Sequence, residues 1–328
     1  MTKIIGREVE AGFGVENVRG TAQSTAEKWI KNTTAYITET AEVVNENSVR
    51  GVLEDSLNRR VVKKKVEGTL EGIVQVDAIG YLFYNVFGDV STVDNTGTFT
   101  HTFSVAQTNT HPSLSTFIKE GGVQQKVFNN SMIGALTINA STDDYLRFSA
   151  GFIASEGEDN TDTPSYDTEY DFIGKDIIFK MADTKAGLSS AIATCIKALD
   201  ITFDQGLIED YCFGSYTPAD INNGKFSIEG TLTKNREDNT FKNLFLSDSA
   251  KYMQITITGD TIISGVTYPS ITILLNKAMV TDWSESGGAD ELVEESITFK
   301  GFYNATDSES GTVKITNLTE EYDTPVSA

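Results

Sequence analysis

The sequence predicts a mainly β protein built from two tandem copies of one β-rich domain, each copy with one short flanking α-helix. Two observations predict this fold class. A stretch in which apolar and polar residues alternate and then change to helical spacing occurs twice. Further matched segments follow both occurrences in the same order. Because the two copies start about half of the 328 residues apart, a tandem duplication explains the pattern.

The first copy of this unit is Val66–Gly88. Its strand places Val66, Gly68, Leu70, Gly72, Val74 and Val76 on one face and Glu67, Thr69, Glu71 and Gln75 on the other. This period of two is typical of a sheet with one packed and one wet face. Helical spacing follows at Ile79, Leu82, Phe83, Val86 and Phe87. Asp77 is the predicted N-cap of this helix and Gly88 its end.

The second copy lies in Phe226–Leu246. Ile228–Leu232 repeats Val66–Leu70, and Asp238 is the predicted N-cap before Phe241, Leu244 and Phe245. Downstream, two more pairs of segments match: His111–Ile118 with Tyr268–Leu275, and Met132–Phe152 with Met279–Phe302. Short strands separated by turn signals in each half predict β-sandwich packing.

The remaining elements follow in chain order. Glycines and the lack of a period predict an extended N-terminal arm up to Ile30, and a first strand follows within Lys31–Val44. Asn45–Arg60 is a long polar excursion, and the acidic stretch Ser155–Asp171 is a predicted mobile loop. Lys175–Ala182 and Gly311–Leu318 are matched closing strands. The predicted domains are the arm 1–30, the first domain 31–185, the second domain 186–319 and a tail 320–328.

Composition and charge narrow the function classes. A formal charge of −21 argues against binding to nucleic-acid phosphates or to an anionic membrane. No signal peptide or membrane-spanning run is recognisable, which predicts a cytoplasmic origin. Cys195 and Cys212 flank a predicted hairpin with its turn at Gln205-Gly206, too far apart for a disulfide, so we expect two buried thiols.

The sequence offers no catalytic, cofactor-binding or metal site, so we expect no enzyme and no cofactor. His101 and His111 are predicted to be surface or hydrogen-bonded residues. Nucleophile-elbow, phosphate-loop, zinc-protease and paired-cysteine motifs are missing from the sequence. The basic run Arg59–Lys65 is interpreted as a solvated strand end near acidic neighbours.

The order of the motifs resembles a known family. Gly14–Ile30 (GVENVRGTAQSTAEKWI) is followed by KVEGTLEG, an amphipathic helix, a TH…PSL segment, a paired-strand block and a second half that closes on KITNLT. This order resembles the tail tube proteins of long-tailed, siphovirus-like bacteriophages, of the kind with two fused tube domains. The resemblance implies a β-sandwich with one flanking helix in each tube domain. It also implies six domains per ring, so three chains would form a pseudo-hexamer.

The resemblance further implies a virion protein whose rings stack into the hollow tail tube that conducts DNA to the host. The implied partners are other copies of the chain, the tape measure protein, the tail terminator and baseplate proteins, with viral DNA passing without specific binding and no membrane. Assembly would take place in the host bacterial cytoplasm. The segments that could bridge successive rings are Met1–Ile30, Thr319–Ala328 and Asn45–Arg60, the last with candidate residues Asn47, Arg50, Glu54, Asp55 and Arg59.

The polar face of the repeated strands predicts the wall of the channel. The candidate lumen-facing residues are Glu67, Thr69, Glu71, Ser227, Glu229 and Thr231. An acidic lumen would repel DNA phosphates and let the duplex slide. Lys63 and Lys65 share this face, so either neighbouring carboxylates neutralise them at a joint between subunits, or the face assignment fails at that end. The alternatives are a tail terminator or baseplate ring of the same fold and a monomeric β-sandwich binding module.

Overall fold

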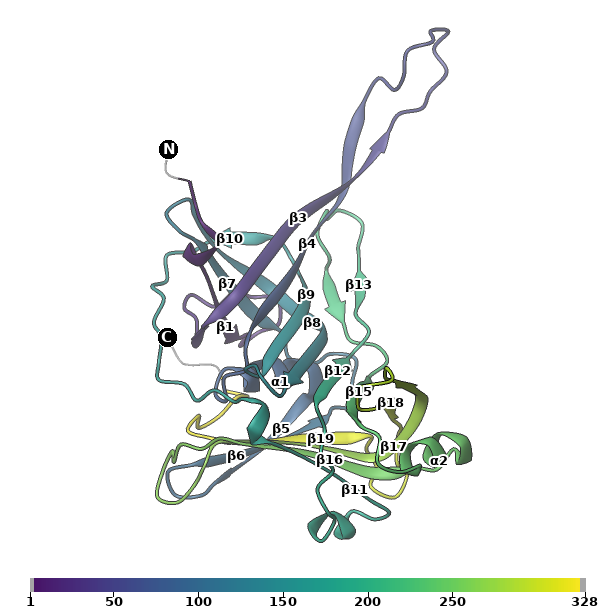
Figure 1. The fold of residues 1–328 in the computed structure, drawn as a ribbon. Coiled ribbons are helices and arrows are strands. Elements are labelled where there is room, and N and C mark those ends of the chain that lie inside the picture. Colours follow the sequence, from purple (N-terminus) through teal and green to yellow (C-terminus); the bar gives the residue numbers. More distant parts are fainter. Residues whose placement is uncertain (1–2, 325–328) are drawn as a thin grey trace.

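The computed structural model describes residues 3–324 and confirms the mainly β fold class (Figure 1). Two α-helices occur in this range, one in each half of the chain, together with short 3-10 helices at Gly6–Glu8, Gly174–Asp176 and Ala186–Ser189. The terminal residues 1–2 and 325–328, which belong to the predicted arm and tail, lie outside the described residues. The predicted domain boundaries stay a prediction.

One run of eight antiparallel strands forms the inner sheet. In hydrogen-bonded order its strands are β3 (Asn32–Asn45), β4 (Arg59–Ile73), β9 (Arg147–Ala154), β8 (Gln124–Ser141), β12 (Ala198–Asp204), β15 (Ser227–Asn235), β18 (Glu294–Gly301) and β17 (Ser270–Ser286). Four strands come from each half of the chain. The pairing of β8 with β12 joins the two sets of four into one sheet.

A second run of strands packs across the inner sheet and interlocks the halves. Its order is β11 (Ile177–Ala182), β16 (Lys251–Thr258), the first part of β17, β19 (Gly311–Asn317), β6 (Phe99–Val105) and β5 (Gly88–Asp94). The two predicted closing strands exchange partners, because β11 of the first half pairs with β16 of the second and β19 of the second half pairs with β6 of the first. One core cluster accordingly contains residues of both halves.

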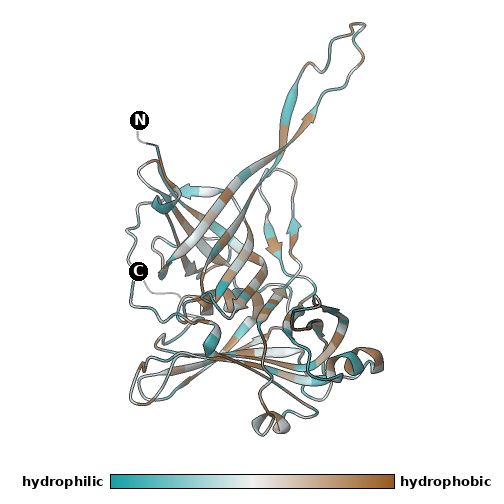
Figure 2. Ribbon diagram, in the orientation of Figure 1, coloured by the Kyte–Doolittle hydropathy of each residue, from teal (hydrophilic) through white to brown (hydrophobic). Residues whose placement is uncertain are grey.

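Smaller strands complete the fold. β1 (Val9–Val15) pairs with both β2 (Lys28–Ile30) and β7 (Leu114–Glu120), and β10 (Gly157–Asp159) pairs with the first part of β8. A separate hairpin consists of β13 (Ile208–Asp210) and β14 (Asp220–Asn222). Figure 2 shows alternating hydrophobic and hydrophilic bands along the main strands, as expected where one face is packed.

Helix α1 (Ile79–Phe87) lies in the core, and the prediction of this helix and of its end is confirmed. Gly88 has φ of 84° and donates its N–H to the carbonyl oxygen of Tyr84, which is the left-handed C-terminal conformation that glycine adopts without steric cost. The predicted cap at Asp77 is wrong. Ala78 is the N-cap, and the buried Asp77 carboxylate instead accepts hydrogen bonds from Leu318 and Thr319 near the C-terminus.

Helix α2 (Thr240–Ser247) confirms the second predicted helix. The N-cap residue is Asn239, one position later than predicted, although the Asp238 carboxylate accepts the N–H of Thr240 at 2.7 Å. This helix buries only Phe241 and Leu244, whereas α1 buries all but one of its residues. Helix α2 therefore lies at the side of the molecule with part of its apolar face uncovered.

The two halves share detailed backbone features, which is consistent with a duplication. Gly68 of β4 lies opposite Phe152 of β9, and Gly230 of β15 lies opposite Phe299 of β18. In both places a Cβ atom on the glycine would overlap the phenylalanine ring, so the ring occupies the space that glycine leaves. The pairings of β8 with β9 and of β17 with β18 also shift register at corresponding points.

Two expectations about loops are wrong. Residues 9–30, expected in an extended arm, include β1 and β2 and reach the second half, where Arg19 binds Asp220 at 2.7 Å. The acidic stretch expected to be mobile packs along these strands, since Asp162 accepts hydrogen bonds from the Ala26 N–H and the Trp29 ring N–H. The arm was expected because glycine at alternate positions of β1 (Gly12 and Gly14) removes the side-chain pattern that identifies a strand.

The predicted hairpin around Gln205-Gly206 is also wrong. β12 pairs with β8 and β15, and the chain after Gly206 leaves the sheet to form β13 and β14. Cys195 and Cys212 are both free, as expected, but both are exposed, which contradicts the prediction of buried thiols. The sequence pattern did not reveal that the strand's second neighbour comes from the other half of the chain.

The C-terminal segment folds back onto α1. The ring of Tyr322 is buried and contacts Tyr81 edge-on with 5.0 Å between ring centroids. Its hydroxyl donates to the carbonyl oxygen of Asp77 at 2.7 Å and accepts from the Asn317 side chain at 2.6 Å. A Cβ on Gly80 would overlap this ring. Glycine inside α1 is therefore required by the close approach of Tyr322.

We expect Gly80→Ala to lower the free energy of unfolding by about 1–3 kcal/mol, the usual range for overpacking a core. The sign is diagnostic, because alanine inside a helix otherwise stabilises by about 1 kcal/mol over glycine. Urea denaturation of the wild type, Gly80→Ala, Tyr322→Ala and the double variant measures it. In the Tyr322→Ala background the Gly80→Ala change is expected to be neutral or stabilising; an equal loss in both backgrounds contradicts the packing account.

Candidate functional site

The polar face of the inner sheet is the first candidate surface. A row of directly opposed residues crosses five strands, consisting of Glu71, Ser149, Thr137, Thr202 and Glu229. Directly opposed residues share a face of a sheet, and residues two apart on a strand share it too. The structure therefore brings all six predicted residues onto one face: Glu67, Thr69, Glu71, Ser227, Glu229 and Thr231. The opposite face of these strands packs into the core, as Leu70, Ile201 and Leu232 show.

Carboxylates outnumber basic groups on this polar face. By strand register the acidic residues there are Glu42, Glu67, Glu71, Asp200, Asp204, Glu229, Asp282 and Glu294, and the basic residues are Lys63, Lys65, Arg147 and Lys300. Lys63 and Lys65, in the first half of β4, do share this face. Carboxylates of the same chain neutralise them, since Lys65 contacts Glu67 at 2.5 Å and Glu209 at 3.3 Å, and Lys63 lies 3.7 Å from Glu42.

Both outer edges of the inner sheet are open. Within the described residues, β3 pairs with β4 alone, and Asp282–Ser286 of β17 pairs with β18 alone. β3 is 14 residues long and carries exposed Tyr36, Val43 and Val44. A long open edge of this kind presents a row of backbone donors and acceptors that another strand can pair with.

The β3–β4 hairpin is the second candidate surface and extends far from the body of the molecule (Figure 1). Its connecting loop contains Asn47, Arg50, Glu54 and Asp55, and Arg59 begins β4 directly after it. The Arg50 side chain donates to the Asp55 carbonyl oxygen at 2.7 Å, and Ser56 donates to the Asn47 side chain at 2.8 Å. The structure thus brings these predicted residues together in one loop.

Apolar side chains at the hairpin tip were missed by the sequence interpretation. Val49, Val52, Leu53 and Leu57 are all exposed there, and Val49 and Leu53 have full access to solvent. They are interspersed with charged residues, so the loop appeared simply polar in sequence. Four exposed aliphatic side chains on one projecting loop make the hairpin tip a candidate contact surface.

A buried charge cluster holds the N-terminal strands and the acidic stretch against α1. Lys28 lies 2.7 Å from Glu169 and 3.2 Å from Asp167, and the Asp77 N–H donates to Glu169 at 3.2 Å. Burial raises the pKa of both Asp77 and Glu169, and the nearby Asp77 charge raises the pKa of Glu169 further. The Lys28 charge opposes both shifts, while its own pKa is raised by Glu169 against the effect of burial.

The histidines are structural. His101 is buried and lies 2.9 Å from the Thr319 carbonyl oxygen and 2.9 Å from the Thr92 hydroxyl, and burial lowers its pKa. His111 is buried between the Gln205 side chain and the Ala106 carbonyl oxygen, at 3.1 Å from each. Of the two predicted alternatives, surface or hydrogen-bonded, the structure confirms the second.

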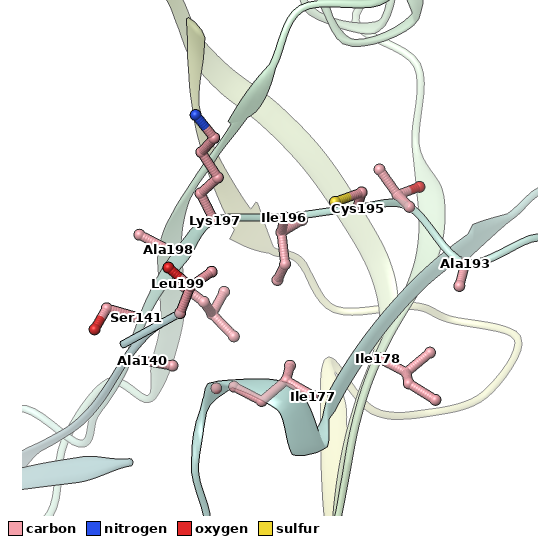
Figure 3. A pocket seen from close by; sticks show the side chains of 13 residues that line it. Ala140, Ser141, Ile177, Ile178, Ala193, Cys195, Ile196, Lys197, Ala198 and Leu199 are labelled. Atoms are coloured by element: carbon pink, nitrogen blue, oxygen red, sulfur yellow. The ribbon is translucent and has the colours of Figure 1, made fainter. Parts of the chain in front are cut away.

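A groove of about 280 Å³ lies where the two halves meet, at the end of β8 and the start of β12. Its lining is mostly aliphatic, and Figure 3 shows Ile177 and Leu199 facing the groove while the Lys197 ammonium points away. Within residues 3–324 there is no group of three side chains suited to hold a metal ion. Neither described helix is long and apolar enough to cross a membrane.

The structure thus presents an extended sheet with one polar face and two open edges. The family of phage tail tube proteins matches residues 6–301 of this chain. The chain therefore belongs to the phage tail tube protein family and is a structural protein of the virion, not an enzyme.

No curated protein matches the sequence. Among solved structures, the SPP1 tail tube, determined by solid-state NMR and cryo-EM, matches with 15% sequence identity and a TM-score of 0.32. That match covers 46% of this chain and 81% of the SPP1 chain. A likeness at this level supports no detailed inference.

We expect Lys28→Met to destabilise the chain by about 3–5 kcal/mol at pH 7, because it leaves two buried carboxylates without their cation. The loss is expected to be smaller near pH 5. A carboxyl whose folded pKa is raised contributes stability below its unfolded pKa and loses it as the pH rises through the folded pKa. Removing Lys28 raises both folded pKa values further, so the variant loses more stability across this range.

Urea denaturation at pH 5 and pH 7 measures the effect. Lys63→Met, which removes an exposed ion pair, is the matched control and is expected to change stability by less than about 1 kcal/mol at either pH. A Lys28→Met loss that does not depend on pH contradicts the assignment of the buried charges.

Proposed function

We propose that three copies of this chain join edge to edge into a ring and that the rings stack into the hollow tube of a phage tail. The observation that carries the proposal is the continuous inner sheet, with one polar face, one core face and two open edges. Each chain supplies two similar four-stranded units, so three chains give six units and a pseudo-hexameric ring. The halves cannot separate easily, because their closing strands are exchanged.

Open edges support closure into a ring. Stable soluble proteins shorten, charge or cover the edge strands of their sheets, and a closed barrel removes the edges altogether. Here β3 is long, contains no proline and has its outer edge open along its length. Pairing with another copy satisfies the backbone groups of both edges at once.

The polar face is then the inner wall of the tube. The residues expected to face the lumen are those predicted from sequence: Glu67, Thr69, Glu71, Ser227, Glu229 and Thr231. The excess of carboxylates on this face makes the wall acidic, so viral DNA is repelled from it and passes without specific binding. A neutral or basic lumen in the assembled tube contradicts this part of the proposal.

The β3–β4 hairpin is proposed to contact the next ring. It projects beyond the sheet, and its exposed Val49, Val52, Leu53 and Leu57 offer apolar area that a neighbouring ring can cover. The candidates Asn47, Arg50, Glu54, Asp55 and Arg59 supply polar contacts beside them. The described part of the C-terminal tail is packed on α1 through Tyr322, so it supports the hairpin as the bridging segment instead.

Further proposals follow from membership of the family. The partners of the tube are the tape measure protein, the tail terminator and the baseplate proteins, and assembly takes place in the cytoplasm of the host bacterium. A terminator or baseplate ring is the alternative within the same fold, and a monomeric binding module is the alternative outside it. A tube protein, a single-ring protein and a monomeric module differ in how far they assemble.

Negative-stain electron microscopy of the purified protein across a concentration and salt series tests the proposal. Uniform rods with a stain-filled channel and a regular axial repeat are expected. Single rings that never stack favour a terminator or baseplate ring, and particles of monomer size under all conditions favour a binding module.

Removing the hairpin tip is expected to separate ring formation from stacking. Asn45 and Arg59 are directly opposed, so replacing residues 46–58 by Asn-Gly closes the strands with a two-residue turn and leaves the body of the chain intact. We expect an unchanged melting temperature, rings of normal diameter and no rods. Substituting serine for the four exposed apolar residues alone is the milder variant and is expected to reduce rod length. Rods of wild-type length from the loop-deleted chain contradict the role of the hairpin.

A further inference from the structure

The joint between β8 and β12 inside the chain is a template for the joint between chains. We propose that β3 of one copy pairs antiparallel with residues 282–286 of β17 in the next copy in the register of the β8–β12 pairing, which places Thr38 opposite Ser284 of the neighbouring copy. This inference rests on the proposed ring and goes beyond it, because it specifies which residues meet.

β3 holds the same place in the first unit as β12 holds in the second. β3 pairs with β4, β12 pairs with β15, and β4 and β15 are the two copies of the repeated strand. Ile37 of β3 lies opposite Gly68, and Ile201 of β12 lies opposite Gly230. Since Gly68 and Gly230 hold the same position in the repeat, Ile37 corresponds to Ile201, and Thr38 corresponds to Thr202.

β17 likewise holds the same place in the second unit as β8 holds in the first, because β8 pairs with β9 and β17 pairs with β18. Ile133 lies opposite Phe152 and Val280 lies opposite Phe299, and in both strands the register shifts by one residue directly afterwards. After the shift Thr137 lies opposite Ser149, and Ser284 lies opposite Ser296. Ser284 therefore corresponds to Thr137.

Within the chain Thr137 and Thr202 are directly opposed, and their hydroxyl oxygens are 2.9 Å apart. Transferring this pair to the open edges places Thr38 opposite Ser284, which preserves a hydroxyl on both sides. The same transfer places Glu39 opposite Trp283 on the core face. A slip of one residue would put Trp283 on the polar face, so the pattern of faces opposes it.

On the core side of the sheet, the single chain covers the aromatic side chain of α1 but not its counterpart in α2. Across the internal joint, Phe83 of α1 is fully buried and contacts Phe203 of β12 with 5.6 Å between ring centroids. Its counterpart in the repeat, Phe245 of α2, is 37% exposed. The difference is expected if α2 is covered only when β3 of the next copy arrives beside β17.

The two edges also offer matching apolar groups. Beside β3 lies a groove of about 190 Å³ whose apolar lining is Ile37, Ile118 and Phe128. Its charged lining consists of Glu120 and of Glu39, which forms an ion pair with Lys126. The β17 edge presents Trp283 with two cations over its ring, Arg236 at 5.3 Å and Lys242 at 5.1 Å from the ring centroid. The aromatic ring suits the apolar part of this groove, and the charged groups of both edges are already paired within the chain at Glu39 and Arg236.

Disulfide trapping tests the register. In a Cys195→Ser, Cys212→Ser background, the in-register chain carries Thr38→Cys and Ser284→Cys. The shifted chain carries Thr38→Cys and Ser286→Cys, on the same face but one side-chain repeat further along the strand. Directly opposed residues lie within disulfide reach, whereas a shift of two residues adds about 6.6 Å along the strand. Thr137→Cys with Thr202→Cys reports the internal joint.

Each sample is oxidised, run on a non-reducing gel and viewed by electron microscopy. Covalent multimers up to the trimer are expected from the in-register chain only, with an intrachain bond in the internal control. Rods without interchain bonds in the in-register chain, or with bonds in the shifted chain, overturn the register and leave the tube intact. Covalent trimers without rods support the register and contradict the stacked tube. An in-register sample that forms neither rods nor interchain bonds contradicts both the register and the stacked tube.

Discussion

The pairing of β8 with β12 is the interaction on which the rest of the structure depends. It converts two four-stranded units into one sheet, so the polar residues of both halves share a single face. It also buries the aromatic side of α1 against β12, because Phe83 and Phe87 both contact Phe203. By satisfying one edge of each unit internally, it leaves the chain with one open edge at either end of the sheet, and a chain with two such edges is suited to pair with copies of itself.

The exchange of closing strands reinforces this joint. β11 completes the sheet of the second half and β19 that of the first, so neither half can leave without breaking a strand pairing. Tyr322 and Asp77 then tie the end of the chain to α1, and Lys28 ties the N-terminal strands to the same region through Glu169. Rigidity of the two-domain unit follows from these contacts. A ring made of three such units has fewer joints to form than a ring of six separate domains.

The sequence predicted the elements that repeat and missed those whose partners are distant. Both strand–helix units, the end of α1 at Gly88 and the shared face of Glu67 and Glu229 followed from local periodicity. β1 was missed because Gly12 and Gly14 left no side-chain pattern, and the hairpin after Phe203 was wrongly predicted because the partner of β12 is β8. Asp77 was assigned to a cap because its role depends on Leu318 and Thr319, far along the chain. Local rules cannot find such partners.

Rotational averaging of end-on views of assembled rods by cryo-electron microscopy tests the central claim most directly. The account predicts three-fold symmetry, with six similar lobes of which alternate ones differ, because only the first half of each chain carries the long β3–β4 hairpin and the matching strands β12 and β15 are short. It also predicts one continuous inner wall of strands that crosses from chain to chain without a gap. True six-fold symmetry, or an inner wall interrupted between chains, would contradict it.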